Sequence, residues 1–274
     1  MAFVSTKLRL YSFSPLASRL SPLASRLSPL ASRLSPLALS AALIFGSASA
    51  APVNWVPNAD GFWDVATNWS SNPALPGAAD NVTIDVGGAT VRTITHQSGT
   101  DTINSLTSQE NIALTGGTLN LNAASMINGS YTQSGGILGG TGNLTVTGAA
   151  TLSGGVMTDA GRTILQGATA LTALSLDALR VLENRGAVTW SAGELDLNAT
   201  GAAGVGQIEN ALGGVFEATG DNTLSSTAKA VGGDGDGASF TNAGTFGRVR
   251  NFVCEQCVEI QSVITKRSPN WIAS

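Results

Sequence analysis

Pairs of small residues return at an almost constant interval along the middle of this chain. Three pairs lie 19 residues apart, at Gly116-Gly117, Gly135-Gly136 and Gly154-Gly155. Ala192-Gly193 follows two such periods later, and another 19-residue step separates Gly213-Gly214 from Gly232-Gly233. A period of about 20 residues is typical of a solenoid, because one coil this short cannot bury its own apolar face and must stack on its neighbours.

Short β-prone runs lie between these turns and alternate apolar with polar residues. Residues 82–86, 119–121 and 144–146 each show the period of two that a half-buried strand requires. Only 5% of the chain is aromatic whereas 33 residues are glycine, so the interior must be narrow. We therefore expect an all-β fold: a right-handed parallel β-helix over residues 81–246. Coils would stack at about 4.8 Å, with ladders of like Thr and Asn side chains along the stack.

A second recurring unit combines Asn and Gly with a following apolar residue. It occurs at residues 182–188 and 240–246, with a looser copy at 208–216. Asn tolerates left-handed backbone and Gly adopts it freely, so the unit predicts a strand, a tight turn and a strand. Its copies are 26 and then 32 residues apart, which requires loops of different length. Residues 171–182 fit either a short helix or two more strands, and the 19-residue register favours strands.

The first 50 residues have the features of a secretory signal peptide. Basic residues precede an apolar run at 37–45, no acidic residue occurs before Asp60, and Ser47-Ala48-Ser49-Ala50 forms an Ala-x-Ala site. This pattern predicts cleavage after Ala50 and a secreted or cell-surface protein, in bacteria at the outer membrane or outside it. The apolar run is too short to remain as a membrane span.

The same leader contains a seven-residue repeat, SPLASRL, present three times and begun a fourth time at Ser35. Proline in every unit removes a helical hydrogen bond and argues against a coiled coil. Slippage that lengthened a charged leader explains the repeat. An organelle transit peptide is the alternative for a leader rich in Arg and Ser and free of acids.

Charge excludes some classes of partner. Residues 51–246 contain 16 acidic and 5 basic residues, a net charge of −11. Such a balance argues against binding to nucleic acid or to an anionic membrane surface.

Residues 51–80 are unusually rich in tryptophan, with Trp55, Trp63 and Trp69 among the five in the chain. Bulky aromatic residues are suited to cover the open end of a coil stack, so we expect an N-terminal cap here. The alternative is that the three indoles are exposed and contact carbohydrate by stacking on sugar rings.

Two motifs resemble metal or redox sites without completing them. Cys254 and Cys257 have Cys-x-x-Cys spacing, but zinc needs two further ligands and redox chemistry needs a different fold context. Residues 232–237 (GGDGDG) resemble a calcium turn, but Gly237 stands where the motif requires Asp, and there is one copy only. We expect a local disulfide, or no role, for the cysteines and an acidic loop at 232–237.

Catalytic signatures are equally incomplete. Glu194 and Asp196 alternate along one expected strand and would share a face, as a glycosidase pair would, but they flank Leu195 in an ordinary inside-out strand. A Ser–His–Asp site would need His96, the only histidine, and no nucleophile elbow is present. The sequence predicts no catalytic residue, no cofactor and no metal ion.

The Gly-Gly turns, the Asn-x-Gly units and the long leader resemble passenger regions of autotransporters and filamentous-haemagglutinin-like surface proteins. The resemblance covers residues 51–246 and implies an exported β-helix that serves in adhesion or as a stalk. It implies host or matrix glycans or proteins as partners and a separate outer-membrane transporter for export. No catalytic motif of such proteins is matched.

The last 28 residues, 247–274, change character. They contain both cysteines, four basic residues and one glycine, and the coil pattern stops after Phe246. We expect an atypical tail, from a truncated or frame-shifted gene, with a C-terminal cap as the competing interpretation. The leading hypothesis is a noncatalytic surface protein. The alternatives are a secreted polysaccharide-active enzyme on the same coil and a nonfunctional gene fragment.

Overall fold

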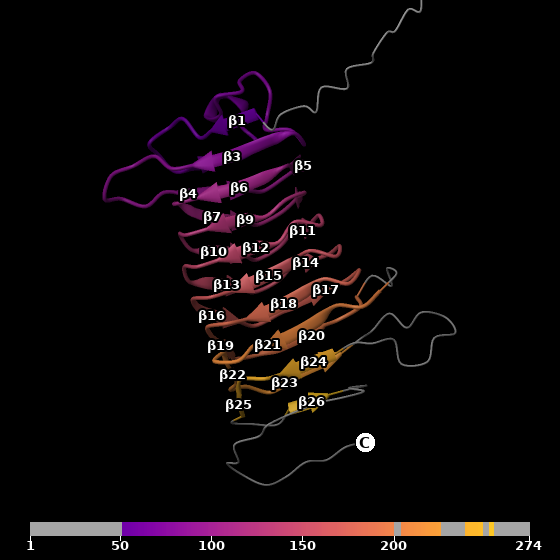
Figure 1. The fold of residues 1–274 in the computed structure, drawn as a ribbon. Helices are drawn as coiled ribbons and strands as arrows, with labels where there is room; N and C mark the ends of the chain where they lie inside the picture. Colours follow the sequence, from indigo (N-terminus) through magenta and orange to yellow (C-terminus); the bar gives the residue numbers. More distant parts are fainter. Residues whose placement is uncertain (1–50, 200–203, 226–238, 249–251, 255–274) are drawn as a thin grey trace, which may run out of the picture. The chain divides into compact units, whose positions relative to one another are not determined.

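The computed structural model describes residues 51–199, 204–225, 239–248 and 252–254 of the 274-residue chain (Figure 1). Within these residues the secondary structure is β, apart from one 3₁₀ turn, η1 (Ala66–Asn68). The predicted signal peptide at 1–50, the acidic loop at 232–237, Cys257 and most of the atypical tail lie outside the described residues.

The described strands form three sheets, in which every pairing is parallel. Sheet 1 has nine strands: β1 (Ala51–Asn54), β3 (Asp80–Ile84), β6 (Ser105–Ser108), β9 (Ser125–Ile127), β12 (Leu144–Val146), β15 (Arg162–Leu165), β18 (Val181–Asn184), β21 (Gln207–Asn210) and β24 (Ser239–Asn242). Sheet 2 has nine: β2 (Gly61–Phe62), β4 (Thr93–His96), β7 (Asn111–Leu114), β10 (Tyr131–Gln133), β13 (Ala150–Leu152), β16 (Ala168–Leu171), β19 (Ala187–Trp190), β22 (Val215–Ala218) and β25 (Thr245–Arg248). Sheet 3 has eight: β5 (Thr100–Ile103), β8 (Thr118–Leu121), β11 (Ile137–Gly139), β14 (Val156–Met157), β17 (Leu174–Leu176), β20 (Gly193–Asp196), β23 (Asn222–Ser225) and β26 (Phe252–Cys254).

The order of the strands defines a parallel β-helix. From β3 onward the chain visits sheet 1, sheet 2 and sheet 3 in turn and then returns to sheet 1, one coil further along the stack (Figure 1). From β3 to β23, each strand pairs with the strand three places later in the sequence, for example β12 with β15. The predicted all-β fold and parallel β-helix are confirmed.

The 19-residue period is the register of the central coils. Thr107 pairs with Met126, Leu144 with Thr163 and Arg162 with Val181. The first three Gly-Gly pairs lie between sheets 2 and 3, and their second members have positive φ (68°, 65° and 87° at Gly117, Gly136 and Gly155). A left-handed conformation at this corner explains the preference for glycine.

Gly213-Gly214 does not belong to this series. It lies between β21 and β22, at the corner between sheets 1 and 2, because longer loops intervene after β20. The register step grows to 26 residues between Val181 and Gln207 and to 32 between Gln207 and Ser239. The 19-residue distance to Gly232-Gly233 is therefore no evidence for a further coil.

A second glycine series, which the sequence analysis missed, occupies that corner between sheets 1 and 2. Gly129, Gly148, Gly167 and Gly186 follow one another at 19-residue steps. A Cβ at Gly148 would lie 2.1 Å from the carbonyl oxygen of Gly129, and one at Gly167 would lie 2.1 Å from that of Gly148. The backbones stack so closely here that no side chain fits between them.

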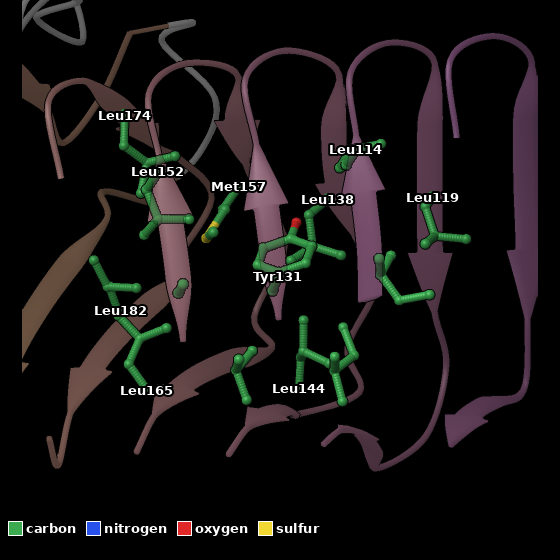
Figure 2. Packing of buried hydrophobic residues seen from close by; sticks show 14 of the residues in the cluster. Leu114, Leu119, Tyr131, Leu138, Leu144, Leu152, Met157, Leu165, Leu174 and Leu182 are labelled. Atoms are coloured by element: carbon green, nitrogen blue, oxygen red, sulfur yellow. The ribbon is translucent and has the colours of Figure 1, made fainter. Parts of the chain in front are cut away.

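The interior is filled by aliphatic side chains from all three sheets (Figure 2). In the central coils Leu114, Leu152 and Leu171 come from sheet 2, Leu119 and Leu138 from sheet 3, and all are at most 2% exposed. Burial of each such side chain contributes about 2 kcal/mol. The alternative of a helix at 171–182 is wrong, because β16, β17 and β18 occupy this stretch in register with the coil before.

One interior column is a polar ladder. A column here means the residues at one register position in successive coils. Asn184, Asn210 and Asn242 form one, each 6% exposed or less. Asn184 Nδ2 donates to Asn210 Oδ1 at 2.8 Å, and Asn210 Nδ2 donates to Asn242 Oδ1 at 2.6 Å. The prediction of Asn ladders is confirmed.

Both ends of the predicted coil region differ from expectation. Residues 51–80 already contribute β1 and β2, which pair with β3 and β4, so no break in the sheets marks residue 81. After Phe246, β25 continues to Arg248, and β26 pairs with β23. Among the described residues, the backbone therefore keeps the coil register at Gly247 and Arg248 and again at Phe252–Cys254, beyond the point where the sequence pattern stops.

Candidate functional site

The three N-terminal tryptophans form one buried cluster. Trp55, Trp63 and Trp69 are 4%, 0% and 1% exposed. The ring centroids of Trp69 lie 5.0 Å from Trp55 and 4.6 Å from Trp63, in edge-to-face arrangements. Trp69 Nε1 donates to the carbonyl oxygen of Trp63 at 2.7 Å.

This packing leaves no open indole face on which a sugar ring could stack, which favours the cap interpretation over the carbohydrate one. Trp69 also forms an antiparallel bridge with Trp55. The backbone carbonyl of Asn54 accepts from the Ser70 amide at 2.9 Å, and the Val56 amide donates to the backbone carbonyl of Asn68 at 2.9 Å. The chain itself therefore covers the edge at the C-terminal end of the first strand.

An ion-pair cluster lies on the outer face of sheet 1, and we name it the sheet 1 cluster: Arg162, Glu183, Arg185 and Glu209. Arg162 Nη1 donates to Glu183 Oε2 at 2.8 Å and to Glu209 Oε2 at 2.5 Å. Arg185 Nε donates to Glu183 Oε1. The cluster joins three successive coils, because its members come from β15, β18, the turn after β18, and β21.

Sequence reasoning missed this cluster, although the 19-residue period contained the signal. Glu183 follows Arg162 by one period and two residues, so the two share a face on adjacent strands. Glu183 and Glu209 are direct register partners, and two carboxylates placed so close need a cation between them.

The electrostatics of the sheet 1 cluster favour the charged forms of Glu183 and Arg162. Burial favours the neutral form of Glu183, but the hydrogen bonds and charges of Arg185 and Arg162 outweigh it and hold the pKa below the ordinary 4.5. The hydrogen bond to Glu209 raises the pKa of Arg162. Glycoside hydrolysis needs a carboxylic acid whose pKa is raised, and a catalytic base needs a free lone pair near neutral pH. The pKa of Glu183 is lowered, so the first condition is not met at this residue. The geometry is that of a cross-link between coils.

The structure places Glu194 and Asp196 on one face of β20, on either side of the buried Leu195, as predicted. Glu194 accepts a hydrogen bond from the Ser225 hydroxyl. Asp196 Oδ1 accepts from the Asn198 amide at 3.0 Å. Each carboxylate therefore accepts a hydrogen bond from a nearby backbone or side-chain donor, which indicates a structural role.

His96 and Asp101 form a pair that the sequence did not reveal. His96 is 1% exposed, and its Nε2 lies 2.9 Å from Asp101 Oδ2. Its Nδ1 lies 2.9 Å from the carbonyl oxygen of Gly116. A histidine with both nitrogens facing acceptors has no lone pair to offer a nucleophile. The nearby Ser98 donates to Asp64 instead, at 2.5 Å, so no Ser–His–Asp geometry is formed.

Arg180 is a second buried charge, at the corner between sheets 3 and 1. Its guanidinium is 0% exposed and donates to the carbonyl oxygens of Gly140 (3.2 Å) and Thr158 (3.4 Å) and to Thr163 Oγ1 (2.8 Å). Burial lowers the pKa of Arg180 to about 10, which leaves it charged at neutral pH. Arg180 thereby supplies hydrogen bonds to buried carbonyl groups at two earlier corners between the same sheets, which is a structural role.

The outer face of sheet 2 contrasts with these charged groups. Its central column contains only Thr and Ala over six coils: Thr95, Ala113, Thr132, Thr151, Ala170 and Thr189. The first charged residue in this column is Glu217. Over these six coils the column is uncharged and consists of small side chains.

Within the residues that the structure describes, no group of three or more His, Cys, Asp or Glu side chains is arranged to hold a metal ion. In the same part of the chain, no helix has the length and apolar character needed to cross a membrane.

Comparison with known proteins identified no relative. No protein-family model matches the chain, and neither the curated proteins nor the solved structures gave a significant match. The fold itself defines the class: a parallel β-helix solenoid with a tryptophan-packed first coil.

Proposed function

We propose that this chain is an exported, noncatalytic β-helical surface protein that acts as a stalk or an adhesin-like passenger, in the style of autotransporter and filamentous-haemagglutinin-like passengers. The observation that carries the proposal is the parallel coil stack itself, whose polar groups are used to join coils. A solenoid with nearest-neighbour contacts gives a repetitive surface suited to extension and contact.

The outer face of sheet 2 supports a binding role over a chemical one. Its Thr and Ala column offers hydroxyl and methyl groups at regular spacing and no titratable group over six coils. Host or matrix glycans or proteins are the partners that the proposal names, and a separate outer-membrane transporter would export the chain.

Export is tested by expressing the full chain with an internal epitope tag in a Gram-negative host. In a host without the separate transporter, we expect a mature protein that begins at Ala51 and has left the cytoplasm. Replacement of Ala48 and Ala50 by bulky residues should leave an uncleaved precursor, because the signal peptidase site requires small residues. An unprocessed protein retained in the cytoplasm would contradict the proposal.

A polysaccharide-active enzyme is the second candidate, because an Arg–carboxylate set on the face of a β-helix is present in the sheet 1 cluster. Incubation with acidic and neutral polysaccharides, followed by assays for reducing ends and unsaturated products, separates the two. We expect no product above that of the Glu183→Gln/Arg162→Gln variant. Activity lost in that variant while its circular dichroism spectrum is kept would establish the enzyme instead.

A further inference from the structure

The interior of the first complete coils contains one polar pair whose register partners in the next coil are apolar. His96 has Leu114 as its register partner in the next coil of sheet 2, and Asp101 has Leu119 as its partner in sheet 3. Both positions point inward, and Leu114 and Leu119 are 0% and 2% exposed. The chain therefore places an ionisable pair in a site that two leucines can fill.

The acceptors that face both ring nitrogens favour the doubly protonated form of His96. A carbonyl oxygen can only accept, so Nδ1, at 2.9 Å from the Gly116 oxygen, must carry a proton. Nε2 faces the Asp101 carboxylate at 2.9 Å and is protonated as well. His96 is thus an imidazolium that is paired with Asp101. Gly117 makes room for it, because a Cβ there would lie 2.8 Å from His96 Cε1.

This imidazolium lies where the tryptophan-packed segment meets the coils. The Trp63 ring centroid is 6.1 Å from that of His96, and the Trp63 amide donates to Thr95 at 2.9 Å. The adjacent Asp64 accepts from Ser98 Oγ at 2.5 Å and from Gln97 Nε2 at 3.5 Å. Residues on both sides of His96 therefore tie Trp63 and Asp64 to the turn between β4 and β5.

We propose that His96 is a proton-operated latch: its imidazolium, held between Asp101 and the Gly116 carbonyl, fastens residues 61–69 to the first coils, and loss of its proton loosens that attachment. A neutral imidazole would direct one lone pair at an acceptor, either the Gly116 oxygen or the Asp101 carboxylate. A buried repulsive contact of this kind costs more than the loss of one hydrogen bond.

The direction of the pH dependence follows from the groups that face His96, which are Asp101 from β5 and Asp64 from the segment after β2. Burial opposes its charge, but the hydrogen bonds to Asp101 and Gly116 and the charges of both carboxylates outweigh burial, so the pKa is raised above the ordinary 6.5. Stability from the latch is therefore complete below 6.5 and is lost as the pH rises through the pKa of the folded protein. The pKa of Asp64 is lowered, chiefly by its hydrogen bond from Ser98, so its contribution is present above 3.8 and is lost on acidification.

His96 is the only histidine, so its imidazole signals can be assigned without mutation in the full chain prepared with no histidine tag. NMR titration should give both nitrogens protonated at pH 6 and a pKa above 6.5. Hydrogen exchange of peptides spanning residues 61–69, corrected for the intrinsic effect of pH, should rise several-fold through that pKa. Exchange of peptides from β12 and β15 should not change.

The chain supplies the matched control. In the His96→Leu/Asp101→Leu variant, which copies the Leu114 and Leu119 positions, exchange at residues 61–69 should stay slow and independent of pH. A wild-type pKa at or below 6.5 would overturn the latch. So would exchange at residues 61–69 that does not change through the measured pKa, or a double variant that keeps the wild-type pH dependence.

Discussion

Individual residues in this fold are constrained mainly by the closeness of successive coils. The glycines at the corner between sheets 1 and 2 show this most clearly, because Gly148, Gly167 and Gly186 each lie directly over the carbonyl of the glycine one coil earlier. Such a constraint acts through the backbone and is independent of hydrophobicity. Hydropathy patterns therefore do not reveal it, although the 19-residue spacing does.

Substitution of Gly167 by Ala should destabilise the fold by about 2–3 kcal/mol, since the new Cβ would lie 2.1 Å from the Gly148 oxygen and force the coils apart. Equilibrium unfolding in urea measures the change. Gly77→Ala is the matched control, because its Cβ would make only an ordinary contact, 3.6 Å from Asp80 Oδ2. Equal effects for both variants would show that backbone contact is not the cause.

The turn between β17 and β18 contains residues with a Cβ where the backbone would favour glycine. Ala178 and Leu179 have φ of 49° and 68°, which is unfavourable for residues with a Cβ. Leu179→Gly should stabilise the protein by about 1 kcal/mol, because Leu179 is 52% exposed and little packing is lost. The same change at the 88% exposed Leu212, which lacks a positive φ, should give no gain in the urea midpoint. A loss of stability in Leu179→Gly would argue against the left-handed turn.

At the scale of elements, the interior columns decide which coils belong together. The column that contains Val146 and Leu165 is apolar in the central coils and becomes the Asn ladder at Asn184. The change coincides with longer loops. The Asn184 and Asn210 amides also donate to carbonyls of sheet 2, those of Val215 at 2.9 Å and Thr245 at 3.0 Å. The ladder thus keeps the register where the sequence period is lost.

Asn210→Leu should cost about 2–4 kcal/mol, because it leaves the Asn184 Nδ2 group and the Asn242 Oδ1 atom without their partner. The triple variant Asn184→Leu/Asn210→Leu/Asn242→Leu should regain most of that loss, since removal of both partners of a hydrogen bond costs less than removal of one. Thermal unfolding of the two variants tests this. A triple variant less stable than the wild type by the sum of three such losses would refute the ladder.

The strands were predictable where the 19-residue period agreed with the alternation of apolar and polar residues. The strands from β6 to β18 follow from alternation and the 19-residue step, and this also resolved residues 171–182 as strands. The sheet 1 cluster and the His96–Asp101 pair were not predicted, because they depend on which residues lie opposite each other one coil later. That register becomes visible only when the corner of each turn is known.

At the scale of the whole molecule, the fold is a parallel, in-register stack of consecutive coils. An outward position on sheet 2 offers a direct probe. Thr132 and Thr151 are register partners on β10 and β13, whereas Thr189 lies two strands beyond Thr151. Neighbouring strands in a sheet are about 4.8 Å apart, within the range of Cα distances that a disulfide bridges. Strands with two other strands between them in the sheet, such as β10 and β19, are too far apart.

The decisive measurement is therefore disulfide formation in a background with Cys254 and Cys257 replaced by Ser. The Thr132→Cys/Thr151→Cys variant should oxidise rapidly to an intramolecular disulfide without loss of the β signal in circular dichroism. The Thr132→Cys/Thr189→Cys variant should remain reduced under the same conditions. Failure of the first pair to cross-link, or equal cross-linking of both pairs in the folded protein, would contradict the parallel β-helix.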